Sequence, residues 1–292
     1  MLFNPSALAG KRILVTGAGT GLGKAISEGL LRHGATVYIC GRREGVLQAA
    51  VTDLQERTNG EIHYLVTDIR DPKAVDAMVS EIWQTGSLTG LINNAAANFI
   101  SPTKDISPRG YEAIRSTVMD GSFYTTLSIG KRWINEGIKG SIVSNLVSWV
   151  WTGSAYVVPS AMAKSAIHAM TKSLAVEWGQ YGIRLNAVAP GPFPTEGSRE
   201  KLDPEGSFGD AYVSSVPMAR FGEMTELSNL LVFLQSDACN YLTGQTIAID
   251  GGHYLAALST FSALKSFSED DWKKARDSIK GSVEKEKKQR KN

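Results

Sequence analysis

Seven short apolar runs, separated by segments long enough for helices, restrict the fold of this chain more than any other feature. The runs are rich in Val, Ile and Leu and are bounded by polar, glycine or proline residues, which is typical of buried strands. They cover residues 12–16, 36–40, 62–67, 88–93, 141–147, 183–189 and 246–250. Helix-length segments between them include Leu22–His33, Pro72–Thr85 and Ala161–Tyr181. This alternation predicts an α/β fold with a parallel sheet covered by helices on both faces.

The order of these segments also predicts the domain organisation. No repeat or interdomain linker interrupts the alternation, so we expect one doubly wound domain of about seven strands over residues 1–255. The irregular stretch at about 192–215 is long enough to form a lid over a substrate site. Residues 256–292 are predicted to form a C-terminal helical extension with a basic tail.

Composition excludes several classes of protein. The chain is 42% hydrophobic and 21% charged, and no apolar run approaches the roughly 18 residues of a membrane span. Its two cysteines are far apart and favour a reducing compartment, and the first residues resemble no targeting peptide, so a cytoplasmic location is expected. The last twenty residues hold nine Lys/Arg and three Asp/Glu, typical of a solvated end. No zinc spacing or nucleic-acid motif is present, so neither a metal nor a nucleic-acid partner is expected.

A glycine-rich turn follows the first strand and opens a helix. Within "TGAGTGLG", the glycines at 17, 21 and 23 allow a sharp turn and a close approach to a pyrophosphate, while the helix start offers free N–H groups. The strand-turn-helix context predicts a Rossmann fold that binds a dinucleotide. The residues expected to contact it here are Gly17, Gly19, Thr20, Gly21, Leu22 and Gly23.

The end of the second strand indicates which dinucleotide is bound. An acidic residue there would hydrogen-bond a free ribose diol, but this chain has Arg42 and Arg43. Guanidinium groups pair well with a phosphate, so NADP(H) is the predicted cofactor. The alternative is a pair of solvated surface arginines.

Several motifs together resemble one protein family. "TGAGTGLG", "DIRDP", "NNAA", a lysine-bearing helix and "PGPFPT" resemble the short-chain dehydrogenases/reductases over about residues 8–255. "NNAAANFISP", "SAYVVPSAMAK", "LAVEWGQYGIRLN", "KLDPEGSF" and "FSALKSFSEDDWKKA" resemble, more narrowly, the 2,4-dienoyl-CoA reductases of the mitochondrial type over nearly the whole chain.

The resemblance implies roles for further residues. Asp68 would meet the adenine amino group, with Ile69 against the ring, and Lys164 would bind the nicotinamide ribose hydroxyls. The remaining implied cofactor contacts are Asn94, Ala95, Pro190, Gly191 and Thr195. The implied acyl-CoA contacts are Asn98, Phe99, Trp151 and Lys201, although Phe99 and Trp151 could equally be core aromatics. A homotetramer is also implied, with helices 108–136 and 159–180 between subunits.

The catalytic positions of the family are occupied unusually. Most short-chain dehydrogenases have a tyrosine four residues before the lysine, where this chain has Ser160. Dienoyl-CoA reductases of this type have it fifteen residues before, where this chain has Trp149. The usual serine corresponds to Val147 and the usual asparagine to Asp120, so only Lys164 is unchanged.

The replacements leave the proton chemistry open. The indole N–H of Trp149 can donate a hydrogen bond but is no acid near neutral pH. Asp120 could donate if protonated; burial would raise its pKa, and a nearby Lys164 ammonium would lower it. Tyr156 is either a relocated donor or a phenol at the edge of the core, and Ser148 and Ser160 are further candidates.

These features predict an NADPH-dependent oxidoreductase for an unsaturated acyl-CoA, as in auxiliary fatty acid β-oxidation. Hydride addition to a conjugated dienoyl thioester puts charge on the thioester oxygen, and hydrogen-bond donors stabilise the resulting dienolate. Such a route depends less on a tyrosine than ketone reduction does. The alternatives are a reductase of another CoA-linked or cyclic enone or ketone, and an NADP-binding protein without turnover.

Overall fold

The computed structural model describes residues 4–195, 213–258, 264 and 266–278. It separates into two compact units, Met1–His253 and Tyr254–Asn292. The predicted lid falls largely, and Lys201 entirely, outside the described residues.

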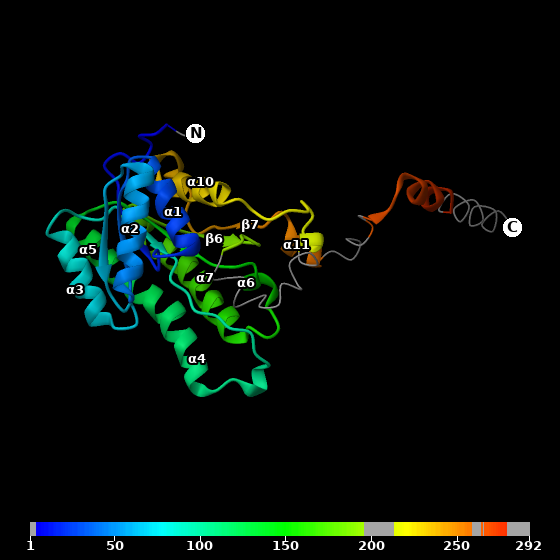
Figure 1. Cartoon of the computed structure of the whole chain (residues 1–292), viewed down its shortest axis with the longest axis horizontal. Helices are drawn as coiled ribbons and strands as arrows, with labels where there is room; N and C mark the ends of the chain where they lie inside the picture. The colour runs from blue at the N-terminus through cyan, green and yellow to red at the C-terminus, as the bar shows by residue number, and fades with distance from the viewer. Residues whose placement is uncertain (1–3, 196–212, 259–263, 265, 279–292) are drawn as a thin grey trace. The chain divides into compact units, whose positions relative to one another are not determined.

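A seven-stranded parallel sheet forms the centre of the first unit (Figure 1). The strand order is β3-β2-β1-β4-β5-β6-β7, and every pairing between neighbours is parallel. The strands are β1 Arg12–Thr16, β2 Thr36–Gly41, β3 Ile62–Val66, β4 Gly90–Asn93, β5 Gly140–Asn145, β6 Ile183–Pro190 and β7 Thr246–Ile249. The predicted α/β doubly wound fold is therefore confirmed, and its strand order reverses between β1 and β4, where such sheets bind ligands.

Helices cover both faces of the sheet, as Figure 1 shows. The larger helices are α1 Gly21–Arg32, α2 Glu44–Thr58, α3 Pro72–Trp83, α5 Gly121–Glu136, α7 Val158–Trp178 and α10 Met224–Gln235. The shorter ones are α4 Pro108–Ile114, α6 Trp149–Thr152 and α11 His253–Leu258. Apolar residues of α1, α2 and α10 share one core cluster, and those of α3, α5 and α7 share another on the opposite face.

The elements differ from their predicted bounds by a few residues, for local reasons. α3 begins where Asp71 accepts a hydrogen bond from the Lys73 amide at 2.8 Å, with proline in the first turn. α7 begins three residues earlier than predicted, because Pro159 lies in its first turn, where proline is tolerated. β5 ends at Asn145 rather than at residue 147, because Val147 and Ser148 already belong to the turn into α6.

The helical segment 108–136 contains a change of helix type. Between α4 and α5, residues Arg115–Asp120 form a π-helical segment, which packs against α7. Such segments are rare and occur frequently at functional sites. Asp120, one of the predicted catalytic residues, is the last residue of this segment.

The second unit contains a short capped helix. Residues 269–278 are helical, and Ser268 and Asp271 exchange hydrogen bonds at its start. The rings of Phe267 and Trp272 pack edge to face with centroids 5.2 Å apart. Among all described residues, no helix combines the length and the apolar character needed to cross a bilayer.

The close contact between α5 and α7 leads to a stability prediction. A Cβ on Gly130 would lie 2.4 Å from the Trp178 ring, so Gly130→Ala should destabilise the fold by about 1–3 kcal/mol through overpacking. Gly45→Ala in α2 is the matched control: nothing lies within 4 Å of its Cβ position, and it should raise stability by up to about 1 kcal/mol. Urea denaturation of both variants tests this, and equal effects would contradict the close approach.

Candidate functional site

The glycine turn after β1 has the shape needed to hold a pyrophosphate. Gly17 has φ +67°, and a Cβ there would lie 2.7 Å from Ala95 Cα, so a side chain is excluded. Gly21 also has positive φ, and Gly19 lies close to Val46 of α2. Thr20 precedes α1 without capping it through its side chain, so the first N–H groups of the helix remain available to an anion.

Hydrogen bonds fix the end of β4 to this turn. The hydroxyl oxygen of Thr16 accepts from the amides of Asn94 and Ala95, each at 3.0 Å. In return, the side-chain amide of Asn94 donates to the carbonyls of Thr16 at 3.0 Å and Gly17 at 3.3 Å. Two of the predicted cofactor contacts, Asn94 and Ala95, therefore lie directly beside the glycine turn.

Asn145 connects this cluster to Lys164. At the end of β5, its side-chain amide donates to Asn94 Oδ1 at 3.0 Å, and its backbone carbonyl accepts a short hydrogen bond from Lys164 Nζ. Lys164 is only 8% exposed, and burial lowers its pKa from 10.5 to about 8. Sequence reasoning missed Asn145, although an asparagine inside the apolar run "SIVSNLV" was a visible signal.

The candidate hydrogen-bond donors lie on α6, α7 and the turns beside them. Ser148 and Ser160 are buried, and Trp149 is half-buried at the start of α6. Within the described part of the chain, the side chains of these three residues have no hydrogen-bond partner. They are therefore available to a ligand that carries an acceptor oxygen.

Tyr156 has a different environment from these donors. Its backbone is in the left-handed region, with φ +64°, and its carbonyl accepts from the Ser101 amide at 2.9 Å. Its side chain is 59% exposed, which places it at the surface and not at the edge of the core. A non-glycine residue with positive φ is uncommon, and such strain is concentrated at ligand-binding sites.

Asp120 pairs with an arginine. Its Oδ2 lies 2.7 Å from Arg115 Nη1, and its side chain is 15% exposed. Arg115 also contacts Glu112 at 2.7 Å. This contact gives the Asp120 carboxyl group a guanidinium partner on its own helical segment. Among the described ion pairs, Asp120 is joined to Arg115 and not to Lys164.

The residues expected to contact adenosine follow β2 and β3. Arg42 and Arg43 are exposed just after β2. Asp68 forms a bidentate ion pair with Arg70, and this hydrogen bonding, together with the nearby Arg42 charge, lowers the pKa of Asp68. Ile69 is buried and packs against Gly121 at the start of α5, so its side chain belongs largely to the core.

The segment after β6 returns to the glycine turn. Pro190 ends the strand, and the Gly191 amide donates to Ile249 of β7 at 2.9 Å. A Cβ on Gly191 would lie 2.6 Å from Asp250 Cβ, so the two strand ends are in close contact. A Cβ on Gly21 would lie 3.7 Å from Thr195 Cγ2, which places Thr195 beside the turn.

The predicted substrate contacts are only partly placed together. Asn98 and Phe99 lie on the loop after β4, and the Phe99 ring lies near Gly110. Trp151 is partly exposed and packs edge to face on His168 of α7, with centroids 6.2 Å apart. Both aromatics are therefore at the surface of the first unit and not in its core, and their contact with a substrate stays a prediction.

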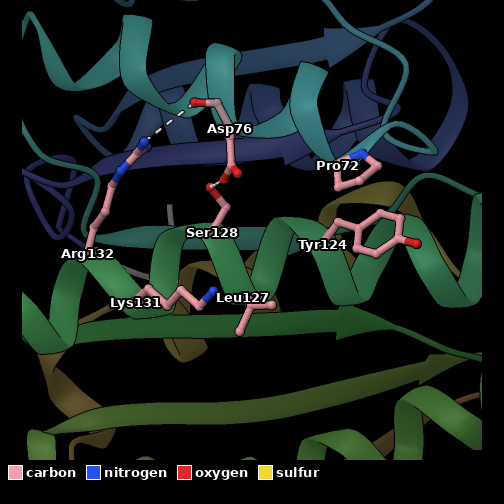
Figure 2. Close-up of a pocket in the computed structure, with 7 residues that line it drawn as sticks. All are labelled: Pro72, Asp76, Tyr124, Leu127, Ser128, Lys131 and Arg132. Atoms are coloured by element: carbon pink, nitrogen blue, oxygen red, sulfur yellow. Dashed lines mark hydrogen bonds between the residues drawn. The ribbon is translucent and has the colours of Figure 1, made fainter.

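A groove elsewhere on the first unit is separate from these residues. Figure 2 shows it between α3 and α5, where Ser128 donates to Asp76 at 2.5 Å. Its volume is about 320 Å³, and none of the predicted site residues lines it. In the described residues, no three His, Cys, Asp or Glu side chains converge as metal ligands.

The burial of Lys164 predicts a pH-dependent contribution to stability. The pKa of Lys164 is about 8 in the folded protein and 10.5 when the residue is exposed, so a protonated Lys164 lowers the free energy of unfolding. This destabilisation is fully present below pH 8 and disappears as the pH rises to 10.5. Lys164→Met has no group to protonate at this position and is therefore free of the destabilisation. The unfolding free energy of the variant minus that of wild type should fall by about 3 kcal/mol between pH 7 and pH 10.5. Urea titrations at both pH values measure this. Lys131→Met, at an exposed lysine, is the control, and the same pH dependence in both variants would contradict the prediction.

Comparisons with known proteins agree with this arrangement. Residues 17–254 match the family model described as enoyl-(acyl carrier protein) reductase. Two Caenorhabditis elegans proteins are each 38% identical: an uncharacterized oxidoreductase, F53C11.3, covering 97% of this chain and 93% of its own, and a probable 2,4-dienoyl-CoA reductase, decr-1.2, covering 96% and 93%. An Agrobacterium tumefaciens structure assigned as a 2-deoxy-D-gluconate 3-dehydrogenase, with bound NADP, is 30% identical with a TM-score of 0.79 over 87% of this chain and 100% of its own. The chain therefore belongs to the short-chain dehydrogenase/reductase family of NAD(P)-dependent oxidoreductases.

Proposed function

We propose that this chain is an NADPH-dependent reductase of 2,4-dienoyl-CoA thioesters. The observation that carries the proposal is the similarity, over nearly the whole chain, to proteins named as dienoyl-CoA reductases, together with the buried Lys164 fixed beside the glycine turn. A homotetramer and a cytoplasmic location stay predictions from the sequence.

The residues present fit a bound dinucleotide. The glycine turn has no room for a side chain at Gly17, and no side chain caps the start of α1. The buried Asn145 Oδ1 has no hydrogen-bond partner within the described ranges of the chain. NADP(H) is favoured over NAD(H) because Arg42 and Arg43 are exposed just after β2, where their guanidinium groups would pair with a ribose 2′-phosphate.

When bound, the reduced nicotinamide would supply hydride to the distal end of the diene. The chain would orient the reactants and stabilise the negative charge that develops on the thioester oxygen. Lys164, fixed by the carbonyl of Asn145, would donate to the ribose hydroxyls and add a positive charge near the reacting atoms. The N–H of Trp149 and the hydroxyl of Ser160 are the donors that would meet the dienolate oxygen.

Asp120 would act as a charged acceptor in this scheme. The positive charge of Arg115 balances the negative charge of the Asp120 carboxylate, so the carboxylate is not an isolated buried charge. It can then accept a hydrogen bond from a water or from a hydroxyl near Lys164. Protonation at carbon can then come from water, and no side chain needs to be a strong acid. Reduction of a simple ketone would need such an acid, which is why a dienoyl thioester is the better substrate for this site.

A second candidate function is NADP binding without turnover. The specific feature in its favour is that Val147 and Trp149 stand at positions where the sequence resemblance implies hydroxyl-bearing residues. Neither residue can exchange a proton near neutral pH.

Turnover with dienoyl-CoA esters separates the two functions. We expect purified protein to oxidise NADPH in the presence of 2,4-dienoyl-CoA of at least one chain length, with a lower rate for NADH, measured by absorbance at the nicotinamide band. Saturable NADPH binding without oxidation across short, medium and long dienoyl chains would exclude the reductase and favour the binding protein. Oxidation only with saturated ketones or cyclic enones would identify a different reductase.

The donor to the thioester oxygen can be identified by two aromatic substitutions. Trp149→Phe removes one N–H and keeps a ring, so kcat should fall by about a hundredfold with a smaller change in KM. Tyr156→Phe removes a hydroxyl from a mostly exposed side chain and should change kcat by less than about threefold. Steady-state kinetics measure both, and the reverse pattern would transfer the donor role to Tyr156.

A further inference from the structure

Asn145 has one buried polar atom that the protein does not satisfy. The residue is 6% exposed, and its Oδ1 has no hydrogen-bond partner among the described residues, although its Nδ2 and its backbone carbonyl each have one. A buried acceptor without a donor costs about 1–3 kcal/mol, so such atoms usually meet a ligand or an ordered water.

The hydrogen-bond network fixes which end of the Asn145 amide is unsatisfied. Asn94 must direct its NH₂ group toward the carbonyls of Thr16 and Gly17, so its Oδ1 faces Asn145 as an acceptor. Asn145 must therefore present its own NH₂ to Asn94, at 3.0 Å. Rotating the amide of Asn145 would place two acceptors opposite each other, so the unsatisfied atom is an oxygen.

The neighbouring strand provides a contrast. Asn186 of β6, which is paired in register with Val143 of β5, is fully buried, and both ends of its amide are satisfied. Its Nδ2 donates to the Leu242 carbonyl at 2.8 Å, and its Oδ1 accepts from the Gln245 amide at 3.1 Å. The fold therefore satisfies a structural asparagine completely, and the unsatisfied oxygen of Asn145 needs another explanation.

The position of Asn145 indicates which ligand supplies the missing donor. Asn145 ends β5, the second strand past the point where the strand order reverses, and adenosine is expected on the other side, near Arg42 and Asp68. The half of a dinucleotide that extends toward β4 and β5 is the nicotinamide riboside. This half carries N–H and O–H donors, in its carboxamide and its ribose, and Lys164 is fixed at the same place by the Asn145 carbonyl.

We infer that Asn145 Oδ1 accepts a hydrogen bond from the nicotinamide riboside half of the bound cofactor, through either a ribose hydroxyl or the carboxamide NH₂. Asn145 is thereby a binding residue through its side chain and a positioning residue for Lys164 through its backbone. The inference rests on the proposed cofactor, but it does not depend on the identity of the substrate.

Truncated cofactors test this contact without any turnover. Asn145→Leu should weaken NADPH binding about tenfold, as expected for one lost hydrogen bond to a buried group, and should leave 2′,5′-ADP, which lacks the nicotinamide riboside, within twofold of wild type. With 2′-phospho-ADP-ribose, which keeps the ribose and lacks the nicotinamide, a tenfold loss assigns the donor to the ribose. No loss with this ligand assigns the donor to the carboxamide. Calorimetric titration gives all three dissociation constants.

Two further variants separate binding from folding. Asn145→Thr can still donate to Asn94 Oδ1 but lacks the amide oxygen, so it should recover thermal stability and not NADPH affinity. Asn186→Leu removes a buried asparagine of structural role and should lower thermal stability while affecting the three ligands equally. An Asn145→Leu effect that is the same for NADPH and 2′,5′-ADP would overturn the inference.

The test also distinguishes failure of the inference from failure of the proposed function. If wild type binds NADH in preference to NADPH, the series NADH, ADP-ribose and ADP makes the same comparison. If the loss of affinity depends on the ligand but no dienoyl-CoA is turned over, the Asn145 contact is supported and the reductase function is rejected. If dienoyl-CoA is turned over but Asn145→Leu weakens all ligands equally, the reductase function is supported and the Asn145 contact is rejected. If no nucleotide binds saturably, both are rejected.

Discussion

The hydrogen-bonded chain from Thr16 through Asn94 and Asn145 to Lys164 is the constraint on which the candidate site depends. It joins the ends of β1, β4 and β5 to α7 through side chains that are buried or half-buried. The strands alone would align backbone atoms but would leave the lysine on a separate helix. Because each amide group in the chain has its direction set by the next, the glycine turn and the Lys164 ammonium have a fixed relation before any ligand binds.

Two charged residues of the candidate site, Lys164 and Asp120, are stabilised in different ways. Lys164 is buried with a carbonyl as its recorded partner, so desolvation lowers its pKa and makes it responsive to a nearby negative charge. Asp120 is compensated by Arg115, which in turn contacts Glu112. The first group is therefore able to respond to a bound ligand, whereas the second is already neutralised.

The sequence predicted the features that depend on local patterns. It could not predict side-chain partners that are determined by the packing of separate elements. Strand periodicity located all seven strands, and the spacing of glycines located the turn. It could not show that Asp120 pairs with Arg115, because residues five apart lie on different sides of an α-helix and come together only in the π-helical segment. The role of Asn145 depends on the β4–β5 register, which no single strand reveals.

The exposure of Tyr156 is another feature that the sequence could not predict. Its phenol was a candidate donor by chemistry and by its distance in sequence from Lys164, but in the structure Tyr156 has a left-handed backbone and is mostly exposed. In the described part of the chain, the candidate side chains without a hydrogen-bond partner are then the half-buried indole of Trp149 and the buried hydroxyls of Ser148 and Ser160, which donate hydrogen bonds but do not ionise near neutral pH. Donors of this kind can disperse charge on an enolate oxygen, but they cannot complete the reduction of a ketone by giving up a proton. Under the proposed function, donors of this kind suit conjugate reduction of a thioester better than reduction of a ketone.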